Sequence, residues 1–540
     1  MTAESASAAE PAWTLTTSEA PTRTRVSEDL LEVMRTPDRW RLPWWGVAMA
    51  VAVAGGVLLR FWATSPLWLD EAQSVVVARL PLSALPGALR QDGAPPLYYL
   101  LLHGWTALFG TGTVAVRSLS GLAGVLALPL MWRMGRRIGG NRVAWISTLL
   151  LASSPFAVRY ATETRMYSLV VLLTLLGFHA LDWAGRRRDW APVAAVAAVT
   201  AALLYTHYWA LWLVGVIGAG LLWRSIRDRS PARRSASRRA LLGVAAGVVG
   251  FLPWTPILAF QLRHTGTPWA DPASLAGVLH AIGLWAGGGG AFARLQALLF
   301  FALLGLGVFG RPQGPSAILL DLHARPAGRA LAAVSLGTMV VALSAALLTS
   351  SSYAVRYTAV CFAPFLVLLG LGADTFGDLR VLRGVVSVLV VLGFVGAVPL
   401  AGQVRTQAGE VAAALSARAS SADVVAYCPD QLGPGVSRLA PAGLDQLSYP
   451  TGGSPQRVDW VDYAARNARS SPADFVRLLE HRAVGHGLWL VYSPGYHTLQ
   501  DKCAAVRTLL SQVRPGATTV VTVRPHVFER EALYYFPPPR

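Results

Sequence analysis

The sequence predicts a polytopic α-helical membrane protein that carries an additional C-terminal α/β domain. Of its 540 residues, 54% are hydrophobic and 14% are charged, and apolar runs long enough to cross a bilayer recur between positions 44 and 400. From about residue 402, short β-rich runs alternate with helical ones. These observations divide the chain into three expected parts: a tail (1–43), a transmembrane domain (44–401) with a large first external loop (63–113), and a C-terminal domain (402–540).

The N-terminal tail is expected to be disordered and cytoplasmic. Residues 1–43 mix Ser, Thr and Glu with scattered arginines, and they lack the short apolar core and small-residue cleavage site of a signal peptide.

The transmembrane domain is expected to cross the bilayer about eleven times, because each apolar run is a candidate span. The expected spans are 44–62, 114–132, 143–158, 166–184, 190–206, 208–223, 240–258, 295–310, 330–349, 357–373 and 384–401.

Arginines give the expected orientation, since they collect in cytoplasmic loops. Alternate loops, of which RSIRDRSPARRSASRR (224–239) is the richest in arginine, carry 19 arginines in all, whereas the other loops are longer in total and carry fewer. We therefore expect a cytoplasmic N-terminus, an external first loop and an external C-terminal domain. An abundance of Ala, Gly and Arg with a single lysine, Lys502, is typical of a high-GC bacterium, so the expected location is a bacterial plasma membrane.

The formal net charge of +18 does not indicate nucleic-acid binding. Residues 401–540 contribute only +3, from 13 Arg and Lys502 against 11 acids, and most of the remainder lies in short cytoplasmic loops and the tail. The positive net charge therefore reflects the membrane topology of the chain.

The C-terminal domain is predicted from three β-rich runs, 423–427, 488–493 and 520–528, which are separated by helical patterns at 406–418, 472–483 and 500–513. A Gly-Pro-Gly loop follows the first run, and it is read either as a turn or as the border of a ligand site. Cys428 and Cys503 both fall in this domain, where an external compartment permits a disulfide between them.

Polar and aromatic residues gather at the external ends of the predicted spans, whereas the span centres are nearly free of charge. Transporters, in contrast, tend to carry ionisable residues near the midplane. One external cavity at the level of the membrane is the simplest reconstruction. The candidate site residues are Asp70, Glu71, Gln73, Asp92, Tyr98, Arg159, Glu163, Arg165, Tyr167, His207, Arg356 and Tyr357.

This mixture of acids and arginines suits glycosyl transfer from a lipid-phosphate sugar. A carboxylate can take a proton from an acceptor hydroxyl, and arginines can hold a phosphate and stabilise the charge it gains on leaving. We assign Asp70 and Glu71 to catalysis. Donor-phosphate binding is assigned to Arg165, Arg356, Arg159 and Tyr357, and further substrate contacts to Glu163, Tyr167, His207, Gln73, Asp92 and Tyr98.

Four motifs resemble those of membrane glycosyltransferases of the GT-C fold, in particular the group of protein mannosyltransferases and aminoarabinose transferases. They are WLDEAQSV (68–75), DGAPPLYYLLLHGW (92–105), RYATETRMYSL (159–169) and VRY (355–357). The resemblance implies an inverting transferase that uses a polyprenyl-phosphate sugar, mannose- or arabinose-like, at the external membrane face.

The resemblance also implies site residues. The family's catalytic acid resembles Asp70 with Glu71 beside it, its second external acid is most similar in position to Glu163, and Arg165 and Arg356 resemble donor-phosphate contacts. Some relatives have Arg-x-Asp after the third span where this chain reads Glu-Thr-Arg, which leaves the role of Glu163 open.

Other interpretations stand beside this one. The two acids can simply cap a helix N-terminus. The protein can also be a transporter or lipid-carrier flippase with an external sensor domain, or a cell-envelope scaffold. Adjacent acids can bind a divalent metal ion, but no spacing of His, Cys and Asp requires one. The sequence leaves open the sugar and whether the acceptor is a glycan, a lipid or a protein.

Overall fold

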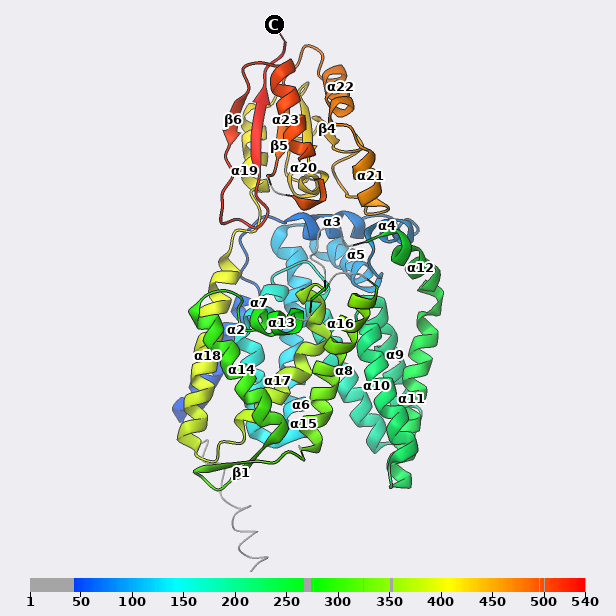
Figure 1. Ribbon diagram of the computed structural model, residues 1–540, viewed down its shortest axis with the longest axis vertical. Coiled ribbons are helices and arrows are strands. Elements are labelled where there is room, and N and C mark those ends of the chain that lie inside the picture. Colours follow the sequence, from blue (N-terminus) through cyan, green and yellow to red (C-terminus); the bar gives the residue numbers. More distant parts are fainter. Residues whose placement is uncertain are drawn as a thin grey trace, which may run out of the picture. The chain divides into compact units, whose positions relative to one another are not determined.

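A computed structural model describes residues 43–266, 273–274, 276–323, 325–349, 353–494, 496–499 and 501–539 of the chain (Figure 1). The predicted disordered tail lies outside these residues, except for Pro43. Two compact units, Met1–Val51 and Ala52–Arg540, make up the chain. The first is described only where its last residues begin helix α2, and everything below concerns the second.

Long apolar helices make up most of the residues before position 402. Eight helical segments within the described residues are long and apolar enough to cross a membrane, and the chain is therefore a multi-pass membrane protein. Three shorter apolar helices accompany them: Trp44–Leu59, Leu97–Phe109 and Ala191–Thr206. The helices in the expected spans are α2 (Pro43–Leu59), α6 (Thr113–Ser153), α8 (Tyr167–Arg186), α9 (Ala191–Thr206), α10 (Ala210–Arg227), α11 (Pro231–Phe251), α12 (Thr255–His264), α14 (Ala291–Phe309), α15 (Pro326–Ala332), α16 (Thr338–Leu348), α17 (Ala359–Ala373) and α18 (Leu379–Gly402).

Helix α6 contains the expected span 114–132 and most of the span 143–158, whose last residues lie in α7 (Pro155–Ala161). Its backbone breaks at Gly140, which has φ 80° and ψ −169° inside an otherwise continuous helix. Glycine adopts this conformation without the steric cost that a Cβ would bring. Three arginines precede the break and Arg142 follows it, which fits a tight connection between two helices at one membrane face.

Short helices lie at the other end of the helical bundle, where the polar motifs of the sequence are found (Figure 1). The first external loop folds into α3, α4 and α5 rather than remaining irregular, and α4 ends at Gly93. These short helices are α3 (Leu69–Ala78), α4 (Leu85–Asp92), α5 (Leu97–Phe109), α7 (Pro155–Ala161) and α13 (Gly277–Trp285), with 3₁₀ turns η1 (Leu252–Trp254) and η3 (Val355–Thr358) and a π-helical turn η2 (Ala333–Gly337) nearer the other end. A hairpin of β1 (Gly310–Gln313) and β2 (Ala317–Leu320) connects α14 to α15.

A five-stranded sheet organises residues 402–539, in the order β4-β3-β5-β7-β6. Strands β4, β3 and β5 are parallel, whereas β7 runs antiparallel to both β5 and β6. The strands are β3 (Val424–Cys428), β4 (Asp445–Ser448), β5 (Leu488–Tyr492), β6 (Thr518–Val521) and β7 (Ala532–Phe536). The helices are α19 (Ala408–Arg418), α20 (Gly433–Ser437), α21 (Tyr463–Arg469), α22 (Pro472–Arg482) and α23 (Lys502–Val513), with 3₁₀ turns η4 (Asp430–Leu432) and η5 (His497–Leu499).

Alternation along the central strands gives the sheet two buried faces. In β5, Leu488 and Leu490 face one hydrophobic cluster, which includes residues of α22 and α23, while Trp489 and Val491 face another, which includes residues of α19. Burial on both faces explains why these strands read as continuous apolar runs. Cys428 and Cys503, for which the sequence predicts a disulfide, are bonded, with Cα atoms 5.5 Å apart.

Two details of the sheet differ from the sequence prediction. The run 520–528 is a strand only up to Val521, and this strand begins earlier than expected, at Thr518. Strands β4 and β7 were not predicted. The Gly-Pro-Gly loop forms α20, which packs against α3, and a Cβ on Gly435 would stand 3.3 Å from the carbonyl oxygen of Leu67.

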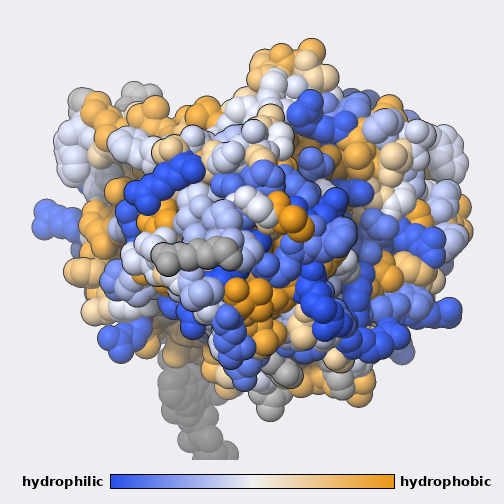
Figure 2. All heavy atoms as spheres, turned by 90° about the horizontal axis from the view of Figure 1, so that it is seen from above, coloured by the Kyte–Doolittle hydropathy of each residue, from blue (hydrophilic) through white to orange (hydrophobic). Residues whose placement is uncertain are grey.

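The sheet domain lies over the end of the bundle that carries α3, α4 and α5 (Figure 1). Viewed from that side, hydrophilic residues cover much of the surface, and hydrophobic ones are more frequent toward its rim (Figure 2). The opposite end carries the arginine-rich connection between α10 and α11. This arrangement places the polar motifs between the helical bundle and the sheet domain.

Candidate active site

A cavity of about 780 Å³ opens between the ends of the membrane helices and the sheet domain. Helix α3, the loop after α4 and the loop before α8 form one side of it. The segments around α9, α12 and η3 form the other side, together with residues of the sheet domain. Of the predicted site residues, those that line the cavity are Asp70, Gln73, Asp92, Arg165, Tyr167, His207, Arg356 and Tyr357.

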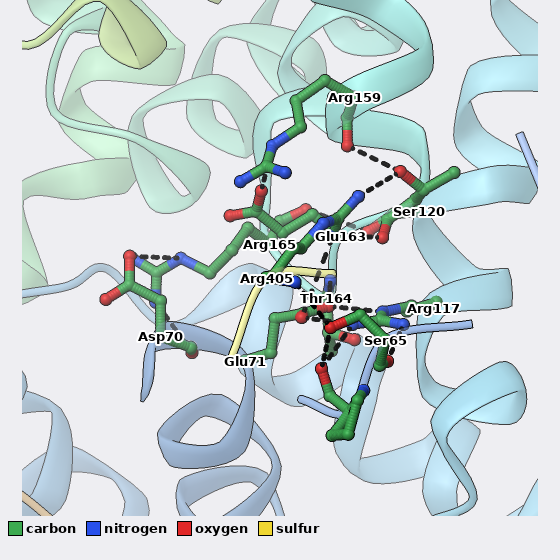
Figure 3. Close-up of polar contacts among 12 residues, drawn as sticks. Ser65, Asp70, Glu71, Arg117, Ser120, Arg159, Glu163, Thr164, Arg165 and Arg405 are labelled. Atoms are coloured by element: carbon green, nitrogen blue, oxygen red, sulfur yellow. Dashed lines mark hydrogen bonds and ion pairs between the residues drawn. The ribbon is translucent and has the colours of Figure 1, made fainter. Parts of the chain in front are cut away.

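Asp70 lies in the first turn of α3 and points toward Arg165 (Figure 3). Its Oδ2 is 3.4 Å from a terminal nitrogen of Arg356 and 3.9 Å from Nε of Arg165. Both distances exceed the 2.7–2.9 Å that is typical of a charge-assisted hydrogen bond. The carboxylate is therefore held near two positive charges without a close bidentate pair, and it faces the cavity.

Glu71, the neighbouring acid, points elsewhere (Figure 3). Its side chain is fully buried and accepts two hydrogen bonds from Arg117, at 2.7 and 2.6 Å, and one from the backbone N–H of Thr164, at 2.9 Å. Burial opposes ionisation, but these bonds and the charges of Arg117 and Arg405 outweigh it and lower the pKa of Glu71. Since Glu71 does not line the cavity, the expectation that it contacts substrate with Asp70 does not fit the structure.

The different roles of the two acids follow from helix geometry. Consecutive residues of an α-helix lie about 100° apart around its axis. One face of α3 therefore carries Asp70 into the cavity, while another carries Glu71 against α6. Glu71 thus fixes α3 to α6 through Arg117, which also donates to the carbonyl oxygen of Ser65 at 2.7 Å.

Three other predicted residues also lie outside the cavity lining. Glu163 is buried beside Arg159, whose Nε is 3.4 Å from its Oε2. Burial raises the pKa of Glu163, against the opposing charges of Arg159 and Arg405. Tyr98 is buried, and its hydroxyl lies 3.0 Å from that of Ser120. The predictions that Glu163 and Tyr98 contact substrate and that Arg159 contacts the phosphate therefore lack support from the cavity.

Gln73 and Asp92 form a polar pair on the cavity wall. The amide of Gln73 donates to Oδ1 of Asp92, and the hydroxyl of Tyr99 donates to Oδ2 at 2.7 Å. On its other side, Gln73 accepts a hydrogen bond of 2.9 Å from the backbone N–H of Val458 in the sheet domain. The pair therefore connects α3, the end of α4 and the sheet domain.

His207 contributes a neutral donor to the cavity. Burial, together with the charges of Arg165 and Arg356, lowers the pKa of His207 to about 3. The backbone N–H of Trp209 donates to its Nδ1 at 3.1 Å, so Nδ1 is an acceptor and the proton resides on Nε2. Its ring lies between Tyr167 and Tyr357, with centroids 5.8 and 5.0 Å away.

The sheet domain supplies cavity residues that the sequence did not reveal. Trp460, Asp462 and Tyr463 line the cavity, and Asp462 pairs with His264 of α12, with Oδ1 and Nδ1 3.1 Å apart. The backbone N–H of Asp462 also donates to the carbonyl oxygen of His264 at 2.7 Å. No local pattern signals a pairing across 198 residues.

Glu529 of the sheet domain caps the helix that carries Asp70. Its Oε1 accepts a hydrogen bond of 3.2 Å from the backbone N–H of Leu69, an N–H that has no partner within α3. Phe528 packs edge-on against Trp68, with ring centroids 5.2 Å apart. The cap and the adjacent aromatic contact fix the start of α3, and with it the backbone of Asp70.

This cap gives a prediction about pH. Burial, with the charges of Asp70 and Glu71 adding to it, raises the pKa of Glu529 to about 8. The folded protein then binds more protons than the unfolded chain between about pH 4 and 8, so stability falls as pH rises through that window. Glu529→Gln keeps a carbonyl acceptor for Leu69 and removes the titration.

The thermal unfolding temperature of detergent-solubilised wild type should therefore fall from pH 5 to pH 8 more steeply than that of Glu529→Gln. Glu480→Gln, a partly exposed acid paired with Arg514 in the same domain, is the matched control. An identical pH dependence in wild type and Glu529→Gln would contradict the assignment.

No group of three or more His, Cys, Asp or Glu side chains that could hold a metal ion occurs within the described residues. The adjacent acids Asp70 and Glu71, which the sequence offered as a possible ligand pair, diverge, and Glu71 is occupied by Arg117. The two carboxylates therefore do not form a shared ligand set.

Comparison with known proteins supports the fold. Residues 93–257 match the family model described as dolichyl-phosphate-mannose-protein mannosyltransferase. The structure of ArnT from Cupriavidus metallidurans bound to undecaprenyl phosphate is similar, with a TM-score of 0.57 and 15% sequence identity over 92% of this chain and 98% of that one. The structure of ArnT from the same organism in the apo state gives the same TM-score of 0.57 at 15% identity, over 91% of this chain and 98% of that one. No curated protein matches the chain at a significant level of sequence similarity.

The family match falls on the segment that contains three of the cavity elements, and the structural likeness extends over nearly the whole chain. The resemblance predicted from the four sequence motifs is confirmed at the level of the fold: the chain is a multi-pass membrane protein with a GT-C fold, and its residues 93–257 resemble the protein mannosyltransferase family.

Proposed function

We propose that the protein is an inverting glycosyltransferase that moves a sugar from a polyprenyl-phosphate donor to an acceptor hydroxyl, with Asp70 as general base. The observation that carries the proposal is the position of one cavity-facing carboxylate between Arg165 and Arg356. An acid alone could cap a helix, and arginines alone could anchor in the interface. Their convergence in a cavity between membrane helices and a polar domain supports a reaction that needs both.

Donor binding would rearrange these charges. A lipid phosphate competes with Asp70 for Arg165 and Arg356, and arginine pairs favourably with phosphate in a bidentate geometry. Drawing the arginines onto the phosphate leaves the Asp70 carboxylate free to meet the acceptor hydroxyl. The neutral Nε2–H of His207 is a further donor in the same cavity.

The transfer step then follows from these positions. The acceptor oxygen attacks the anomeric carbon as its proton passes to Asp70, and the bond from that carbon to the phosphate oxygen breaks with its electron pair on the phosphate. Arg165 and Arg356 stabilise the charge that develops on the leaving polyprenyl phosphate. Attack from the face opposite the phosphate inverts the anomeric centre.

We further propose a location and a donor class. The polar cavity at the arginine-poor end of the bundle supports a reaction at the external face of a bacterial plasma membrane, with about eleven spans and the sheet domain outside the cell. The motif resemblance supports a mannose- or arabinose-like donor sugar. The acceptor is a hydroxyl of a cell-envelope glycan, lipid or protein.

Release of polyprenyl phosphate tests this proposal. Purified protein is incubated with a panel of polyprenyl-phosphate sugars and cell-envelope acceptors, beside an Asp70→Asn variant. We expect release by wild type with one donor class and strong loss in the variant. No release with any donor, from folded protein and with acceptors present, would contradict it.

Arg356 gives a prediction about donor affinity. Arg356→Ala removes one charged donor to the phosphate, and a hydrogen bond to a charged group contributes enough for the donor KM to rise about 10- to 100-fold. Arg380→Ala, in the first turn of α18 at the other end of the bundle, is the matched control. An unchanged donor KM in Arg356→Ala would remove the phosphate role.

A further inference from the structure

A second, smaller cavity of about 340 Å³ lies between helices α3 and α4 and residues 454–459 of the sheet domain. It shares Gln73 and Asp92 with the large cavity, so the two cavities meet at this polar pair. Its volume falls within the range of small-molecule sites. The transfer mechanism proposed above makes no use of it.

One face of α3 runs from the large cavity into the small one. Asp70 and Gln73, one turn apart, line the first, and Gln73 and Val77, again one turn apart, line the second. A molecule that extends along this face can present one group to Asp70 and place the rest of itself in the small cavity.

Two hydrogen bonds hold the outer wall of the small cavity in place. The backbone N–H of Val458 donates to the side chain of Gln73 at 2.9 Å, and that of Trp460 donates to the carbonyl oxygen of Gln91 at 3.2 Å. Between and beside these contacts, the side chains of Gln456 and Arg457 are exposed at the edge of the cavity. The backbone of this wall is therefore fixed by hydrogen bonds, and the cavity is open to solvent on the external side.

The lining is polar and mixed in character. Amide, carboxylate, hydroxyl and guanidinium groups supply both donors and acceptors, contributed by Gln73, Gln91, Asp92, Ser454, Gln456, Arg457 and Asp459. One arginine against two carboxylates does not favour a phosphate, and the few apolar residues do not form a channel for a lipid tail. A ligand with many hydroxyl groups, each a donor and an acceptor, matches this set.

We propose that the small cavity binds a sugar unit of a saccharide acceptor and holds it so that one hydroxyl of the acceptor reaches Asp70. This inference rests on the proposed glycosyl transfer and adds the class of acceptor. Gln73 and Asp92 lie at the boundary, where the reacting sugar unit and the next one meet.

The test separates binding from turnover. Saturation-transfer NMR of the full-length protein in detergent uses methyl mannoside and the corresponding di- and trisaccharides as probes, without donor. For wild type we expect a saturation-transfer signal on the di- and trisaccharides. In Gln456→Ala or Arg457→Ala this signal should be about 2- to 10-fold weaker, because one hydrogen bond to the saccharide is lost. Gln512→Ala and Arg418→Ala, exposed on α23 and α19, are the matched controls.

Kinetics with the same probes as acceptors complete the test. The KM for di- and trisaccharides should rise in Gln456→Ala and Arg457→Ala, with no change in donor KM. Two outcomes would contradict the saccharide inference and leave the transferase proposal standing. In the first, polyprenyl phosphate is released but only Ser/Thr peptides accept the sugar. In the second, the KM for the saccharides is unchanged in these variants. If no donor is turned over, the transferase proposal fails, whatever the NMR shows.

Discussion

Asp70→Asn is expected to reduce sugar transfer by about 10²-fold or more, the range that a general base contributes. Asparagine has nearly the same shape as aspartate but cannot accept the proton of the acceptor hydroxyl. The change removes the negative charge that faces Arg165 and Arg356 at 3.9 and 3.4 Å. Both arginines line the cavity, where water or the donor phosphate can replace the lost charge.

Two further measurements make this prediction specific. The donor KM of Asp70→Asn should not rise, because the carboxylate no longer competes with the phosphate for the arginines. The unfolding temperature should stay near that of wild type. Asp474→Asn, an exposed acid on α22, controls for the loss of one charge. Wild-type turnover by Asp70→Asn would show that another group takes the proton.

Much of this architecture follows from local sequence. Apolar runs identify the membrane helices because a span must satisfy its backbone internally and meet lipid with apolar side chains. The clustering of acids, arginines and aromatics at the external ends identifies most of the cavity lining for the same reason, since charges are costly inside the bilayer. Arg117 was overlooked, although a lone arginine inside an apolar run is a signal that a buried partner exists.

Other features depend on contacts that local patterns do not encode. The sequence reads Asp70 and Glu71 as a pair, and only the direction of α3 against α6 shows which of them reaches the cavity. The cap from Glu529 joins residues 460 positions apart, and Val458 meets Gln73 across 385 positions. Strands β4 and β7 were missed because their place in the sheet comes from pairing with β3 and β5.

Glu71→Gln is expected to destabilise the folded protein by about 3–5 kcal/mol, the cost of leaving one partner of a buried ion pair unpaired. Arg117 would keep its bond to Ser65 but lose its counter-charge in a site where its side chain is 5% exposed and that of Glu71 is 0% exposed. Thr164 would lose a charged acceptor. The thermal unfolding temperature in detergent, and the yield of folded protein, should both fall.

The contrast with an exposed pair shows whether burial is the cause. Asp182→Asn breaks pairs with Arg137 and Arg186, whose side chains are 53% and 58% exposed, and it should cost at most about 1 kcal/mol. In a double-mutant cycle, adding Arg117→Met to Glu71→Gln should lower the free energy of unfolding little further, because the two residues act as one unit. If Glu71→Gln instead folds like wild type and loses turnover as Asp70→Asn does, then Glu71 acts in the chemistry and not in fixing α3 to α6.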